Sequence, residues 1–155
     1  MKRDPNLHPL SHQHQHGLAL TVQIDRALRD ERGPERLTAL SELAERMWTV
    51  ELRGHFEVEE QTLFPVVRNR VEPGLVERLI SDHREIEIAF QRLRKAAEPE
   101  LPEALRTLAE RLAAHIRLEE RQLFEQIQQV LPHEDLAELG GRLEAELARV
   151  CPRTE

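Results

Sequence analysis

The stretch His55-Phe56-Glu57-Val58-Glu59-Glu60-Gln61-Thr62-Leu63-Phe64 decides how this sequence folds. It recurs sixty residues later as His115-Ile116-Arg117-Leu118-Glu119-Glu120-Arg121-Gln122-Leu123-Phe124, with the histidine, the two glutamates and Leu-Phe at the same offsets. Residues four apart in a helix lie on one face, with Cβ atoms about 5–6 Å apart. Each copy therefore holds a histidine and a glutamate that can bind one metal ion together or simply hydrogen-bond each other.

The composition narrows the class of protein. A chain of 155 residues is long enough for one domain with a core of its own. Its formal charge of −7 argues against nucleic acid or an anionic membrane as a partner. The single cysteine, Cys151, excludes a disulfide framework and a thiolate metal site. Because the sequence shows neither a secretory signal pattern nor a membrane-spanning run, we expect a soluble, cytoplasmic protein.

Proline and glycine mark the ends of the expected helices. We expect helices over about 11–32, 34–70, 73–97, 102–130 and 133–149, with Ser11 as the first N-cap and a kink or an end near Pro65. Aromatic residues make up only 3% of the chain, which disfavours strands. The sequence therefore predicts an all-α protein: an N-terminal arm (1–10), an up-down-up-down four-helix bundle (11–131), and a short fifth C-terminal helix with its tail (132–155).

One histidine of each long helix falls on the apolar face when residues are placed about 100° apart. His55, His83 and His115 lie among leucines, isoleucines and valines of their helices. In the first helix His14 takes this place, whereas His16, two residues on, projects toward solvent. Histidines buried alone would cost several kcal/mol unless paired or metal-bound. Their placement at one level of four helices predicts a shared centre.

Three of these histidines have a glutamate one turn later on the same face. Glu59 follows His55 and Glu119 follows His115, and the third helix offers Glu87 after its histidine. The second glutamates of the repeat, Glu60 and Glu120, lie off the apolar stripe, where we expect them to be solvated or to support the ligands. Taken singly, each pair could also be an ordinary surface pair.

Imidazole and carboxylate ligands without thiolate suit Fe, Mn or Zn. The candidates exceed what one tetrahedral zinc needs, so two ions bridged by Glu59 and Glu119 are favoured. The Glu-x-x-His motif of ferritin-type di-iron proteins is absent, because the residues three before His55, His83 and His115 are Leu52, Ile80 and Leu112. The predicted ligands are His14, His55, Glu59, His83, Glu87, His115 and Glu119.

Together these elements resemble the hemerythrin-like, or HHE cation-binding, family over about residues 10–130. The resemblance is carried by His14, His55-x-x-x-Glu59, Asp82-His83 and His115-x-x-x-Glu119. It implies a four-helix bundle with a non-haem, carboxylate-bridged centre of two iron ions that reacts with dioxygen or nitric oxide.

Two positions depart from the oxygen-carrying members of that family. Those proteins place a second histidine one turn after the third-helix ligand, where this chain has Glu87. Their last bridge is an aspartate five residues after its histidine, whereas Glu119 is four residues after His115. An additional anionic ligand would stabilise the ferric state, which argues against reversible oxygen carriage.

Three hypotheses follow from the sequence. The first is a stand-alone protein that binds two iron ions, with Mn or Zn as alternatives, and handles dioxygen, nitric oxide or iron. The second is an oxidative di-iron enzyme, peroxidase-like or consuming nitric oxide, which ligation by Glu87 would favour. The third is a metal-free helical interaction module whose inward His–Glu pairs form a polar network.

Overall fold

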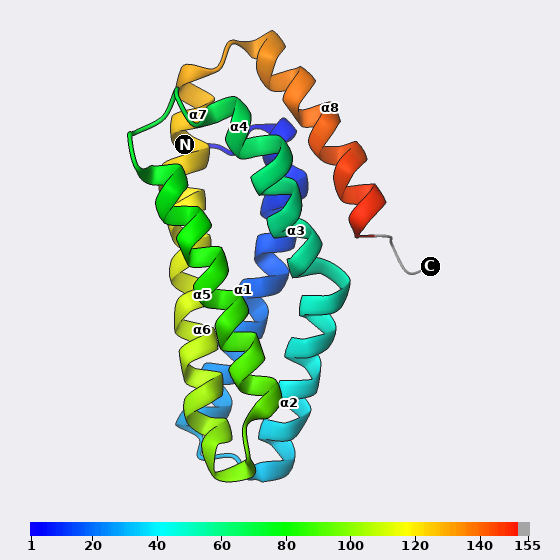
Figure 1. Cartoon of the computed structure of the whole chain (residues 1–155), viewed down its shortest axis with the longest axis vertical. Coiled ribbons are helices and arrows are strands. Elements are labelled where there is room, and N and C mark those ends of the chain that lie inside the picture. The colour runs from blue at the N-terminus through cyan, green and yellow to red at the C-terminus, as the bar shows by residue number, and fades with distance from the viewer. Residues whose placement is uncertain (152–155) are drawn as a thin grey trace.

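The computed structural model describes residues 1–151, and these are mostly helical, with no strand among them. The predicted all-α class is thus confirmed. Five long helical segments follow one another along the chain (Figure 1). Their bounds are His8–Arg29 (α1), Pro34–Val67 (α2 to α4), Leu75–Lys95 (α5), Leu101–Val130 (α6 and α7) and His133–Val150 (α8). Residues 152–155 of the predicted tail lie outside the described part.

Two of the long segments change their helical winding along their length. The second comprises α2 (Pro34–Met47), a π turn η2 (Trp48–Leu52), α3 (Arg53–Val58), a π turn η3 (Glu59–Leu63) and α4 (Phe64–Val67). The fourth comprises α6 (Leu101–Leu118), a π turn η5 (Glu119–Leu123) and α7 (Phe124–Val130). Short 3-10 turns, η1 (Pro5–Leu7) and η4 (Glu98–Glu100), precede α1 and α6.

The π turns η3 and η5 occur at the same place in both copies of the repeat. Each begins at the first glutamate, Glu59 or Glu119, whose carbonyl accepts from the N–H of the phenylalanine five residues later. Pro65 is the second residue after η3, whereas the equivalent residue after η5 is Glu125. The π turn therefore belongs to the repeat and not to the proline. Such turns interrupt α-helices most often at functional sites.

The residues predicted to form an N-terminal arm (1–10) pack into the core and include the start of the first helix. Helix α1 begins at His8, three residues before the predicted start. Leu7 and Leu10 are fully buried and anchor this end of the chain. Ser11 is therefore inside the helix and not at its N-cap, and its hydroxyl donates to Glu120 across the structure (2.7 Å).

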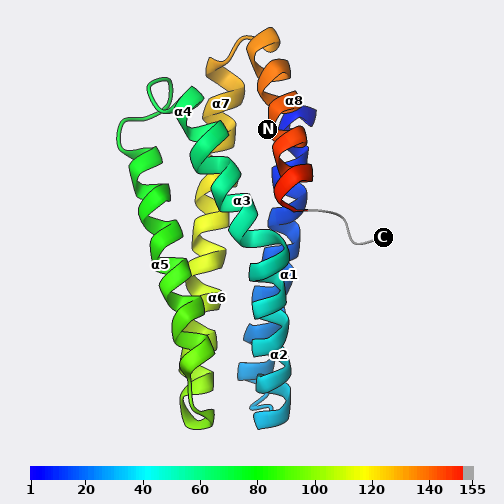
Figure 2. The ribbon, with the colours of Figure 1, turned by 45° about the vertical axis from the view of Figure 1, so that its right-hand side comes forward.

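The first four long segments lie side by side along the long axis of the molecule (Figure 1). The connections α1–α2 and α5–α6 lie at one end, and α4–α5 and α7–α8 at the other. Helix α6 packs against α1 and α5, and α2 packs against the same two helices. Helix α8 lies against α3, η1 and the start of α1, as seen from the side in Figure 2.

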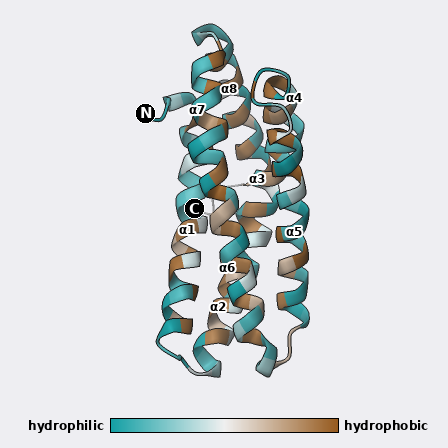
Figure 3. Cartoon of the chain, turned by 90° about the vertical axis from the view of Figure 1, so that its left-hand side faces the viewer, coloured by the Kyte–Doolittle hydropathy of each residue, from teal (hydrophilic) through white to brown (hydrophobic). Residues whose placement is uncertain are grey.

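The buried apolar side chains form two clusters, one toward each end of the molecule. Hydrophobic and hydrophilic residues alternate along each helix in Figure 3, as expected for helices with one buried face. One cluster includes Leu20, Leu40, Phe90 and Leu108, and the other includes Leu10, Leu63, Leu79 and Leu143. On every long helix that contributes to both, the change from one cluster to the other occurs at or beside the inward histidine. The polar residues thus occupy a layer between two apolar ones.

None of the helices in the described part of the chain combines the length and the hydropathy needed to span a bilayer.

Candidate metal centre

Six ionisable residues from four helical segments meet in the layer between the apolar clusters. All are at most 3% exposed, although such residues are rarely buried without partners. They form two groups that share both glutamates. Group 1 is His14, His55, Glu59 and Glu119, and group 2 is Glu59, His83, His115 and Glu119. Within each group the potential ligand atoms all lie within 4.8 Å of one another.

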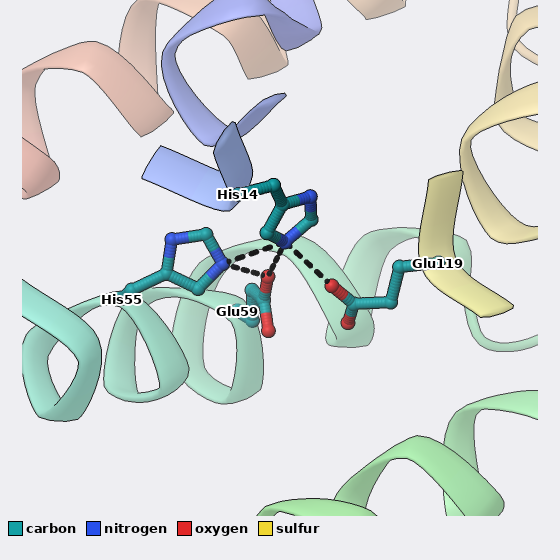
Figure 4. A group of neighbouring side chains, drawn as sticks. All are labelled: His14, His55, Glu59 and Glu119. Atoms are coloured by element: carbon teal, nitrogen blue, oxygen red, sulfur yellow. Dashed lines mark hydrogen bonds and ion pairs between the residues drawn. The ribbon is translucent and has the colours of Figure 1, made fainter. Parts of the chain in front are cut away.

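The side chains of group 1 point toward one another from α1, α3, η3 and η5 (Figure 4). The Nε2 atom of His14 lies 3.0 Å from Nε2 of His55 and 3.0 Å from Oε2 of Glu119. It lies 3.7 Å from Oε1 of Glu59, which His55 also approaches closely. Two imidazole nitrogens and two carboxylate oxygens therefore face one point.

Group 2 repeats this arrangement on the other side of the same two glutamates. The Nε2 atom of His83, on α5, lies 3.0 Å from Oε2 of Glu59. The Nε2 atom of His115, on α6, lies 3.5 Å from Oε1 of Glu119. Each glutamate thus offers one oxygen to group 1 and the other oxygen to group 2, which is the geometry of a bridging carboxylate.

The residues present fit a pair of metal ions better than they fit one another. Six buried atoms have no hydrogen-bond partner among the described residues: both carboxylate oxygens of Glu59 and of Glu119, and Nε2 of His83 and of His115. The short contacts between these atoms lack hydrogen-bond alignment. Buried polar groups are seldom left unpaired, because the loss of solvation costs about 1–3 kcal/mol each or more when charged. A cation in each group would satisfy all six.

The second glutamates of the repeat hold two of the histidine rings from outside. Nδ1 of His14 donates to Oε1 of Glu120 (2.6 Å), and Nδ1 of His83 donates to Oε2 of Glu60 (2.9 Å). A carboxylate can only accept, so Nδ1 carries a proton and Nε2 is the atom of each ring that can bind a metal ion. Histidines that bind metals usually have such a partner. We had two expectations for Glu60 and Glu120, solvation or support of the ligands, and these hydrogen bonds correspond to the second.

The other two rings are held by the residues that precede the histidines of α1 and α5. Nδ1 of His55 faces Oε1 of Gln13 (2.7 Å), and Nδ1 of His115 faces Oδ2 of Asp82 (3.4 Å). The sequence analysis missed Gln13 and gave no role to Asp82. The sequence feature that the two residues share is their position: each directly precedes the inward histidine of a helix that does not carry the repeat.

The phenylalanine that ends each repeat also contacts the centre. Phe64 stacks on His83 (ring centroids 5.7 Å apart), and Phe124 stacks on His14 (5.5 Å). Phe56 also stacks on the His83 ring, with the centroids 4.0 Å apart. These aromatic rings restrict the orientation of the histidines and keep water from that side. The repeated Leu-Phe of the sequence therefore serves the centre as well as the core.

The electrostatics of the cluster favour bound cations. Burial lowers the pKa of His83, but the close carboxylate of Glu59 and the hydrogen bond to Glu60 outweigh it and raise the pKa to about 9. Burial raises the pKa of Glu59, yet the nearby imidazoles of His55, His14 and His83 hold this pKa well below its ordinary value. The neighbouring glutamates also raise the pKa of His14 against the effect of burial. Protons on His14 and His83 thus balance negative charge in the metal-free protein, and a metal ion would displace them.

Glu87 is placed away from both groups, contrary to its expected inward position. It is exposed and lines a hollow of about 320 Å3 between α3 and α5, together with Trp48, Phe56 and Glu60. His83 lies at the edge of the buried stripe of α5, whose centre is displaced toward Ile86 and Phe90. Residue 87, about 40° to the other side of His83, therefore leaves the core.

The remaining candidates stay outside the centre. His16 is exposed and pairs with Glu51 (2.9 Å), as its wheel position predicts. Arg111, one turn before His115, pairs with Glu85 on the surface (2.7 Å). A second hollow, of about 170 Å3, opens between α5 and α6 and reaches Asp82 and His115.

A family model for the hemerythrin HHE cation binding domain matches residues 6–127, which is most of the chain. The chain therefore belongs to this family of cation-binding domains. A search of curated proteins finds no match, and a search of solved structures finds none either.

Proposed function

We propose that this protein binds two iron ions, one in each group, and through them handles dioxygen or nitric oxide. The observation that carries the proposal is the pair of buried carboxylates, Glu59 and Glu119, each with one oxygen directed to each group. The up-down-up-down bundle brings two histidines to either side of them. Membership in a cation-binding family supports the same conclusion.

Iron is the metal that this donor set suits best. Each group offers two imidazole nitrogens and two carboxylate oxygens without a sulfur ligand. Such mixed sets are typical of non-haem iron, with Mn and Zn as the alternatives. Bound iron would supply one-electron redox chemistry and open coordination positions for a diatomic ligand. Four protein donors for each ion leave such positions, because octahedral metals take about six ligands.

The protein's own residues decide what reaches the centre. The larger hollow ends at His83 and the smaller one at His115, so both lead from solvent toward group 2. Each is far larger than a diatomic molecule. Phe56 lines the larger hollow beside His83 and stacks on its ring at 4.0 Å, so this part of the entrance is apolar. Small uncharged molecules are the ligands that this arrangement favours.

The two competing hypotheses receive less support. An oxidative enzyme was favoured by Glu87 as an additional ligand, and Glu87 lies on the surface outside both groups. A metal-free polar network would require the inward atoms to satisfy one another. Six of these atoms have no hydrogen-bond partner among the described residues, which argues that they bind metal ions.

The test is reconstitution with Fe(II) without oxygen, followed by exposure to dioxygen or nitric oxide while the absorption spectrum is recorded. We expect a spectral change with each gas and its loss in a Glu59→Ala, Glu119→Ala double variant, which lacks both bridges. An iron-loaded protein whose spectrum is the same in argon, oxygen and nitric oxide would contradict the handling of either gas.

A further inference from the structure

The two groups have equivalent inner ligands but different residues behind them. We propose that group 2 is the tighter metal position and is filled first, and that Asp82 and Gln13 set this order. The inference rests on the proposed function, because it presupposes that both groups bind metal. It concerns residues that hold ligands in place and not the ligands themselves.

Behind group 2 stand two carboxylates. Glu60 accepts from His83 and Asp82 faces His115. Within the described residues neither carboxylate comes within 4.0 Å of a lysine or arginine nitrogen. Both histidines of group 2 are therefore backed by an anion that forms no ion pair with a lysine or arginine, although the charge of Arg84 acts on Glu60 from further away.

Behind group 1 the corresponding charge is absent or neutralised. His55 is backed by the amide of Gln13, which has no charge. Glu120 does back His14, but Arg3 pairs with its Oε2 (3.0 Å) and Ser11 donates to its Oε1 (2.7 Å). Its charge is thus shared with a cation and a second donor.

This difference acts on the metal through the imidazole rings. An anion that accepts from Nδ1 makes Nε2 a stronger ligand, and losing such a partner typically costs about 10–100-fold in metal affinity. Asp82 is the most distant of the four partners, with its Oδ2 at 3.4 Å from Nδ1 of His115. It is nevertheless a carboxylate, whereas Gln13 is an uncharged amide. Water in the two hollows screens Asp82 and Glu60 in part. We therefore expect a difference of about 10-fold, at the lower end of that range.

Gln13 and Asp82 also occupy equivalent positions, so two substitutions can be chosen to reverse the order in which the groups bind metal. Each directly precedes the inward histidine of its helix and faces the repeat histidine of the next long segment. Gln13→Glu adds a carboxylate behind group 1 without changing the shape of the side chain. Asp82→Asn removes one behind group 2 in the same way. The double swap should invert the order of filling.

The experiment measures the binding of Co(II), which does not change its redox state during the titration, by full-length protein under argon. His55→Ala leaves group 2 intact and His115→Ala leaves group 1 intact, and the two histidines are equivalent in the repeat. We expect His55→Ala to bind one Co(II) about 10-fold more tightly than His115→Ala does. Adding Asp82→Asn to the former should weaken binding, and adding Gln13→Glu to the latter should strengthen it.

The same exchange can be made without removing a ligand. In the otherwise unchanged protein, the Gln13→Glu, Asp82→Asn swap should reverse which group fills first, read from the Co(II) absorption bands assigned with the single-histidine variants. Equal affinities of the two groups, or tighter binding by group 1, would overturn the inference while leaving the proposed function standing. A chain that binds no Co(II) and no Fe(II) would overturn both.

Discussion

Replacing a bridging glutamate should disable both metal positions, whereas replacing a histidine should disable only one. Glu59 offers Oε1 to group 1 and Oε2 to group 2, so Glu59→Ala removes a ligand atom from each. His55 belongs to group 1 alone. The contrast between the two variants therefore tests whether the groups share their carboxylates.

The magnitude can be worked out for thermal unfolding. A ligand at about 100 times its Kd stabilises the native state by about 2.7 kcal/mol, so two equal positions give about 5 kcal/mol. For a domain of this size, about 1 kcal/mol moves Tm by about 2–4 °C, which predicts a metal-dependent shift of about 10–20 °C. His55→Ala should keep about half of this shift, because group 2 remains.

Glu59→Ala should lose nearly all of it. The loss of a direct ligand weakens each position by at least the about 100-fold that an outer partner can cost, so each keeps about 0.4 kcal/mol or less. The remaining shift is then about 2–3 °C.

The assay is differential scanning calorimetry of each variant with Fe(II) under argon and with chelator. Comparing a variant with its own metal-free form cancels any change in the stability of the fold. Glu42→Ala, an exposed substitution on α2, is the matched control and should keep the full shift. A full shift in Glu59→Ala, or equal losses in Glu59→Ala and His55→Ala, would refute the shared-carboxylate geometry.

Three further predictions concern the surroundings of the centre. Glu87→Ala should leave Co(II) affinity unchanged, because the side chain is exposed outside both groups, whereas Glu60→Ala should weaken it by about 10-fold or more; equal effects in a titration would contradict this. In metal-free protein the pKa of His83 is raised from 6.5 to about 9, so its stabilising protonation is complete below pH 6.5 and is lost as the pH rises through about 9. Tm with chelator should therefore fall between about pH 7 and 9, and a rise over that range would be inconsistent with the paired cluster. Leu143→Ala, at a fully buried position on α8, should cost about 2–5 kcal/mol in urea unfolding if this helix is part of the same domain, and a cost below about 1 kcal/mol would show that it folds independently.

The inward histidines could be predicted because each stands alone on an apolar stripe. His14 was separated from His16 by helical periodicity alone, and the structure brings it together with the three others. Glu59 and Glu119 could be predicted to point inward for the same reason. The apolar residues on either side of each glutamate around its helix are buried as well.

Glu87 shows where that reasoning stops. A helical wheel gives the angle between two residues but not the position of the neighbouring helices, which decides whether a residue at the edge of the stripe is covered. His83 lies at such an edge, so a residue about 40° to one side is buried and one about 40° to the other side is not.

Contacts between side chains of different helices likewise could not be predicted from the residue pattern within one helix. Gln13 and Asp82 matter because they face a histidine on the next long segment, and no periodicity within one helix contains that information. The π turns at Glu59 and Glu119 could not be predicted from a helix-breaking residue, because Pro65 follows only one of them.

The most direct test of the central claim is the iron content of the protein after anaerobic reconstitution with Fe(II) and removal of loosely bound metal. Two groups that share two carboxylates predict about two irons per chain, and loss of both in the Glu59→Ala, Glu119→Ala variant. A content below about half an iron per chain in the unaltered protein would contradict the two-metal centre.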